Sequence, residues 1–142
     1  MSQTSILLPC VAMVGLTAAV AVRLYVQRIG EMRARRIRPQ AIATSTKAAE
    51  KLQKVNAADN FRNLFEVPVL FYALCLALLA TQSVNQFYLA GAWTYVGLRV
   101  MHSVIHCTYN NVNHRFAAYL LSTLDLFLMW GVFGAHLLEV LR

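Results

Sequence analysis

Three arginines, Arg62, Arg99 and Arg115, stand beside or within long apolar stretches of this sequence. A guanidinium is a planar fork of N–H donors that holds a carboxylate through two parallel hydrogen bonds. Several guanidiniums near one another therefore suit a ligand that has more than one carboxylate. Glu66 adds a carboxylate that can accept a hydrogen bond from an ammonium group. Together these residue types predict a site for a polyanionic amino-acid conjugate, and glutathione has this chemistry.

The first group of polar residues lies in the stretch "DNFRNLFE". Asp59, Arg62, Asn63 and Glu66 are spaced i, i+3, i+4 and i+7, which predicts that they share one face of a helix. Arg62 and Glu66 can form an ion pair along that face. The alternative is that these side chains only hold neighbouring membrane helices together.

A second group recurs in "RVMHSVIH", where Arg99, His102 and His106 are spaced i, i+3 and i+7. The spacing predicts one polar stripe on an otherwise apolar helix. The stripe continues in neighbouring turns through Tyr95, Tyr109 and Asn110. It is either a polar seam between helices or one wall of a ligand site. Two histidines four residues apart can also hold haem or a metal ion, but the sequence offers no clear third ligand, so no metal is predicted.

Arg115 opens the last apolar stretch, and Tyr119 lies one turn beyond it. Arg115 either faces the stripe on the preceding helix or extends its guanidinium to lipid headgroups. Asp125 lies deeper in the same stretch. An acid at that depth needs a hydrogen-bond donor from another helix or subunit, or it must stay protonated.

The composition indicates a membrane protein with a single domain over residues 1–142. The chain is 58% hydrophobic and 13% charged, which is more apolar surface than a soluble domain of this size can bury. Its net charge is +7, but nine of its 13 lysines and arginines lie between Arg28 and Arg62. A basic loop beside apolar spans is typical of contact with anionic lipid headgroups, so no nucleic-acid partner is expected.

Four apolar stretches predict an all-α integral membrane four-helix bundle. Each is long enough, or nearly so, to cross about 30 Å of hydrocarbon. The second helix is expected to begin well before the bilayer, because good helix formers precede its apolar part. The predicted spans are about 6–26, 60–81, 87–107 and 116–140.

The positive residues predict the orientation of the chain in the membrane. The connection after the first span is rich in arginine and lysine, and the connection after the third contains Arg115. The N-terminal "MSQTS" and the loop "TQSVNQ" have no charged side chain. Because basic loops stay in the cytoplasm, both termini are expected outside, in a periplasmic or lumenal space.

The segments "FRNLFEVPVLF" and "RVMHSVIHCTYNNVNHRFAAY" resemble a known family, the membrane-associated proteins in eicosanoid and glutathione metabolism (MAPEG), nearest its prostaglandin E synthase branch. The resemblance implies four helices per subunit, a homotrimer, and glutathione bound between subunits near the cytoplasmic face. By this resemblance the residues at the glutathione site are Arg33, Arg62, Asn63, Glu66, Arg99, His102, His106, Arg115 and Tyr119.

The resemblance implies a glutathione transferase or peroxidase that acts on lipophilic electrophiles or hydroperoxides from the bilayer. Arg115 is the predicted catalytic residue, because a nearby guanidinium favours the thiolate over the thiol. Asp59, His106 and Phe116 stand where the family commonly has arginine, tyrosine and serine. Asp59 and Phe116 favour one alternative, a non-catalytic trimeric scaffold of the same fold. The other alternative is a haem or metal protein that uses His102 and His106.

Overall fold

The computed structural model describes residues 2–53 and 55–140, and every regular element in that part of the chain is helical. This confirms the all-α prediction. In chain order the elements are η1 (Gln3–Ile6), α1 (Leu7–Ala34), η2 (Pro39–Ile42), α2 (Ser45–Lys51), α3 (Asn56–Asn63), α4 (Val67–Ala80), α5 (Gln86–Cys107) and α6 (Val112–Val140).

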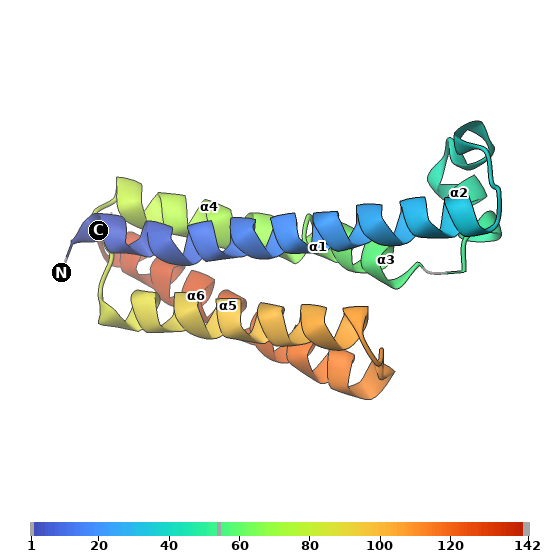
Figure 1. Cartoon of the computed structure of the whole chain (residues 1–142). Coiled ribbons are helices and arrows are strands. Elements are labelled where there is room, and N and C mark those ends of the chain that lie inside the picture. The colour runs from blue at the N-terminus through green and yellow to red at the C-terminus, as the bar shows by residue number, and fades with distance from the viewer. Residues whose placement is uncertain (1, 54, 141–142) are drawn as a thin grey trace.

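Four long helical segments lie lengthwise side by side: α1, α3 followed by α4, α5, and α6 (Figure 1). Helices α5 and α6 form the most extensive contact. Helix α1 begins at the same end of the molecule as α6 ends, and the connection from α1 to α3 lies at the opposite end (Figure 1). The turn between α5 and α6 lies toward that opposite end as well. The two segments that were predicted to be cytoplasmic therefore lie toward the same end.

Three helical segments among the described residues are long and apolar enough to cross a membrane. They are Gln3–Ala34, Asn56–Ala80 and Val112–Glu139, with mean hydropathies of 2.3, 1.9 and 1.6. Helix α5 has 22 residues and nearly the bounds of the predicted third span, but its arginine and histidines make it more polar. The count of four spans therefore remains a prediction.

The second helix is not continuous, and here the sequence prediction is wrong. Helix α3 ends at Asn63 and α4 begins at Val67, with Glu66 at the N-terminal boundary of α4 in a non-helical conformation. Pro68 explains the break. Its nitrogen has no hydrogen to donate, and its ring would clash with the carbonyl of Leu64 in a continuous helix. Because of the break, Asp59, Arg62, Asn63 and Glu66 do not share one helical face.

The core is formed where the four segments meet. The rings of Phe71 on α4 and Tyr95 on α5 stack at 4.5 Å with an interplanar angle of 12°. Gly91 on α5 allows a close approach to α6, because a Cβ there would lie 2.6 Å from the sulfur of Met129. Many large apolar side chains point outward instead, as expected for helices that face lipid. The bundle thus holds α5 firmly against α6, which positions the polar stripe.

Candidate functional site

A cleft of ≈ 180 Å³ lies between α3, α5 and α6, near the turn that joins α5 to α6. Its polar lining comes from three helices, and each of these polar side chains was named in the sequence analysis. The lining residues are Asn63, His102, Val112, Arg115, Phe116 and Tyr119. The structure therefore brings together the α5 stripe, the start of α6 and the last residue of α3.

Arg99 is fully buried behind this cleft, with 0% of its surface exposed. Its Nη2 donates a hydrogen bond of 2.8 Å to the backbone carbonyl of Asn63. Its guanidinium carbon lies 5.3 Å from the centre of the Tyr119 ring, within the range of a cation–π contact. Its Nε and Nη1 are buried without a hydrogen-bond partner in the described part of the chain. A buried guanidinium with unused donors is costly, so an acceptor is expected beside it.

His102 also has an unused position. Its Nδ1 lies 3.0 Å from the backbone carbonyl of Arg115. A carbonyl oxygen can only accept, so Nδ1 donates and the neutral ring keeps Nε2 as an acceptor. That Nε2 is buried and has no partner among the described residues. The ring packs against His106 at 5.5 Å and Tyr119 at 5.7 Å, which fixes its orientation.

Arg115 is held in place by a relay of side-chain amides. Its Nη1 donates to Oδ1 of Asn110 at 2.8 Å, and Nδ2 of Asn110 donates to Oδ1 of Asn56 at 3.3 Å. Asn110 adopts a left-handed conformation, with φ 48°, which asparagine tolerates better than most residues. The side chain of Asn111 then caps α6 by accepting from two backbone N–H groups. The turn thus directs Arg115 to the cleft.

Helix α3 contributes a row of three asparagines, of which the sequence analysis named only Asn63. Asn56, Asn60 and Asn63 are spaced i, i+4 and i+7, and this face of α3 meets α5. Asn60 is fully buried, donates to the sulfur of Cys107 at 3.4 Å and accepts from the hydroxyl of Ser103 at 3.3 Å. The helical period of the three asparagines was the available signal.

A model of the MAPEG family matches residues 6–135, which is most of the sequence. The chain belongs to the MAPEG family. The match includes every residue that lines the cleft, and it does not separate one branch of the family from another. Searches of curated proteins and of solved structures find no match.

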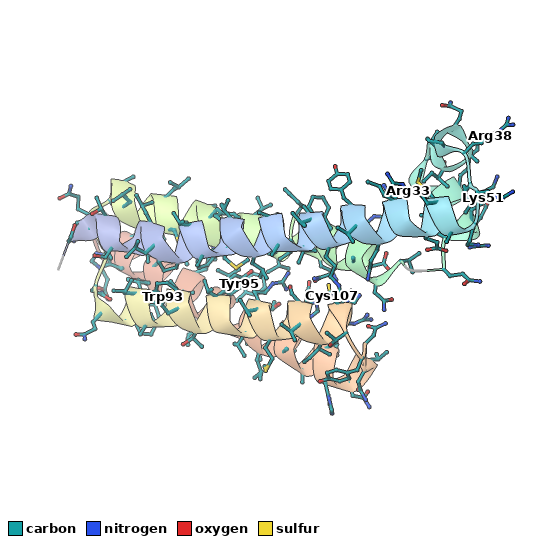
Figure 2. The ribbon with its side chains drawn as sticks, viewed as in Figure 1. Arg33, Arg38, Lys51, Trp93, Tyr95 and Cys107 are labelled. Carbon is teal, nitrogen blue, oxygen red and sulfur yellow. The ribbon has the colours of Figure 1, made fainter. Side chains whose placement is uncertain are left out.

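Five residues that the resemblance assigns to the glutathione site do not line the cleft of this MAPEG subunit. Arg99 and His106 are buried close to it, and the other three lie elsewhere. Arg62 is exposed and faces a different cavity, between α1, α2 and α3. Glu66 is exposed in the break before α4. The ion pair that the spacing allowed between Arg62 and Glu66 is not formed. Arg33 is exposed near the end of α1, close to α2 (Figure 2). Among residues 2–53 and 55–140 the one ion pair joins Glu31 to Arg35, at 2.9 Å.

The structure also places the remaining polar residues of this MAPEG protein. Within the described ranges, no third histidine, cysteine, aspartate or glutamate joins His102 and His106 as a metal ligand. Tyr109 is exposed and contacts His114 at 3.2 Å, so it does not extend the buried stripe. Tyr95 and Asp125 each have a buried oxygen without a partner in the described chain. Asp125 therefore still lacks the donor that its position in the sequence demanded.

Proposed function

We propose that this MAPEG protein is a glutathione-dependent membrane enzyme of the transferase or peroxidase type. The observation that carries the proposal is Arg99, whose Nε and Nη1 are buried beside the cleft without an acceptor. Glutathione has two carboxylates and two amide carbonyls, so it supplies the acceptors that these donors lack. Asn63 and His102 add an amide and a ring nitrogen at the same place. The donor set therefore fits glutathione.

The cleft of one subunit is too small for the whole ligand. Pockets that enclose small molecules usually measure about 300–1,000 Å³, and this cleft is smaller. A second subunit packed against it would complete the walls. The small volume supports a homotrimer with the ligand between subunits. In that arrangement Arg33, Arg62 and Glu66 of one subunit reach the ligand in the cleft of the adjacent subunit. The number three comes from the family resemblance, and native mass spectrometry in mild detergent tests it.

Arg115 performs the central chemical role in this proposal. When bound, glutathione supplies a thiol that can conjugate an electrophile or reduce a hydroperoxide. The free thiol has a pKa of about 8.5, and a guanidinium lowers that pKa because it stabilises the anion. Arg115 lines the cleft and is anchored through Nη1 to Asn110. Its fixed position favours thiolate formation without a separate general base.

The second substrate is expected to arrive from the bilayer. Phe116 lines the cleft and is 61% exposed, so one wall of the cleft continues onto the outer surface of α6. Val112 and Leu120 are exposed on the same helix. An apolar path from lipid to the cleft suits a lipophilic electrophile or a lipid hydroperoxide. The positive residues around α2 favour placing this end of the bundle at the cytoplasmic face, with both termini outside.

A non-catalytic scaffold is the second candidate, and Phe116 favours it. An aromatic ring in the cleft takes the place where the prostaglandin E synthase branch has a serine. Asp59 is weaker support for a scaffold, because its side chain lines the cavity between α1, α2 and α3 and not the cleft. The spacing of Arg99, His102 and Arg115 supports a relation to that branch of the family.

The test is conjugation of glutathione to a generic aromatic electrophile, with glutathione binding measured separately by calorimetry. Removal of Arg115 should slow turnover by roughly 30- to 1,000-fold, in the range seen for loss of one donor to a developing anion. Binding should change far less in the Arg115→Ala variant, because Arg99 still faces the carboxylates. Full turnover in Arg115→Ala, or no thiol-dependent activity in the wild type, would leave the scaffold as the better account.

A further inference from the structure

Two cysteines on different helices lie against each other in the apolar part of the bundle. Cys10 is near the start of α1, and Cys75 is in the second half of α4 with 1% of its surface exposed. Cys10 packs against the core cluster that contains Cys75. The Cys75 thiol donates a hydrogen bond to the Cys10 sulfur, and Cys10 Sγ lies 3.7 Å from the carbonyl oxygen of Ile6. Both cysteines are free thiols.

The packing of α1 against α4 fixes this contact. The two helices touch and run in opposite directions (Figure 1). A second polar contact joins them, a hydrogen bond between Tyr72 on α4 and Thr17 on α1. Cys10 and Thr17 are seven residues apart and Tyr72 and Cys75 three apart, so each pair shares one helical face. Both contacts agree with one antiparallel register, which holds the thiols opposite each other.

Cys10 is the thiol of the pair that a reagent from the bilayer reaches first. It is partly exposed, whereas Cys75 is buried. Its neighbours Leu8 and Val11 are 61% and 66% exposed, so α1 is open to lipid beside it. A partly exposed thiol with a second thiol against it is the arrangement of an attacking and a resolving cysteine. Cys107, the third cysteine, is buried and accepts a hydrogen bond from Asn60 instead.

We propose that Cys10 and Cys75 reduce a lipid hydroperoxide and form a disulfide that joins α1 to α4. The Cys10 sulfur attacks the terminal oxygen of the hydroperoxide, and the O–O bond breaks. The lipid leaves as an alcohol with the Cys10 thiol proton, and Cys10 becomes a sulfenic acid. The Cys75 sulfur then attacks the Cys10 sulfur, the S–O bond breaks, and the hydroxyl leaves as water with the Cys75 proton. The two thiols lose two electrons, and the hydroperoxide gains them.

The surroundings of the pair select an oxidant that dissolves in lipid. Ile6, Leu74 and Leu78 are buried in the same core cluster and exclude water from the side of Cys75. An alkyl hydroperoxide can approach through the hydrocarbon beside Leu8 and Val11. The reaction uses neither glutathione nor Arg115, so it is independent of the proposed function. A small thiol restores the pair by exchange with the disulfide.

The test treats the full chain in phosphatidylcholine nanodiscs with cumene hydroperoxide and no glutathione. A maleimide then blocks the remaining thiols under denaturing conditions. Peptide mass spectrometry should find Cys10 joined to Cys75 within one subunit and Cys107 blocked, with one cumyl alcohol formed per disulfide. The Cys75→Ala variant should stop at a Cys10 sulfenic acid that dimedone traps. The matched control Cys107→Ala should form the disulfide as the wild type does.

The disulfide should also stabilise the bundle, because it closes a long loop of the chain. The thermal unfolding midpoint of the oxidised wild type should rise by about 5 °C or more, and dithiothreitol should reverse the rise. The proposal is overturned if Cys10 and Cys75 stay free after treatment, if Cys10 joins a cysteine of another subunit, or if wild-type Cys10 is oxidised while Cys75 stays unlinked. None of these results bears on glutathione turnover, which is measured separately.

Discussion

Arg99 Nη2 donates to the carbonyl of Asn63, the last residue of α3, at 2.8 Å. The final carbonyls of a helix lack partners within the helix, and a cation near them is favourable. One guanidinium therefore stabilises the broken second helix and keeps Nε and Nη1 unused beside the cleft. The break and the binding site depend on the same side chain.

Replacement of Arg99 should separate these two roles. Arg99→Lys can still donate to Asn63, but it loses the planar fork that matches a carboxylate. We expect glutathione affinity to fall by about 10-fold or more, while thermal stability in detergent changes little. Arg99→Ala should also lower the free energy of unfolding by about 1–3 kcal/mol, because the Asn63 carbonyl loses its donor. Equal glutathione affinity in Arg99→Lys and wild type would count against a role in carboxylate binding.

Asn60 is expected to hold α3 against α5. It is fully buried and links the Cys107 sulfur to the Ser103 hydroxyl. Asn60→Ala leaves the Ser103 hydroxyl without its acceptor and should destabilise the protein by about 1–3 kcal/mol. Unfolding by denaturant in a fixed detergent measures this loss. The control is Asn113→Ala, whose side chain is exposed on the first turn of α6 and should change stability by less than about 0.5 kcal/mol.

Glu31 fastens α2 to the end of α1. Its Oε1 accepts from Arg35 Nη1 at 2.9 Å and from the backbone N–H of Gln53 at 2.7 Å. Glu31→Ala should loosen α2, so that the amides of Ala48 and Leu52 exchange with solvent roughly 10-fold faster or more. Hydrogen exchange by mass spectrometry reads this directly. Glu50→Ala, on the exposed face of α2, is the control, and equal exchange in the two variants would exclude the fastening role.

Much of this arrangement could be predicted from local sequence signals. Helix α5 runs from Gln86 to Cys107, within one residue of the predicted bounds, because Asn85 caps it by accepting from the N–H of Tyr88. Its stripe of Arg99, His102 and His106 is buried as one face. The 3.6-residue period of the helix is sufficient to predict both features.

Other parts depend on tertiary contacts that local patterns do not encode. The good helix formers ahead of Val67 predicted a continuous helix, and the effect of Pro68 on the preceding turn was overlooked. Helix α6 begins at Val112, four residues earlier than predicted, because the side chain of Asn111 caps it. The relay that anchors Arg115 joins residues 54 positions apart, so only the packed bundle reveals it.

The central claim is that Arg115 stabilises a thiolate in the cleft. The most direct measurement is the pH titration of the ultraviolet thiolate absorbance of glutathione bound to the protein, in wild type and in Arg115→Ala. Arg115 is a positive charge, so the pKa of the bound thiol should fall below the free value of about 8.5, and the thiolate should persist to lower pH. In Arg115→Ala the pKa should return toward the free value. A bound thiol that titrates alike in both proteins would contradict the account.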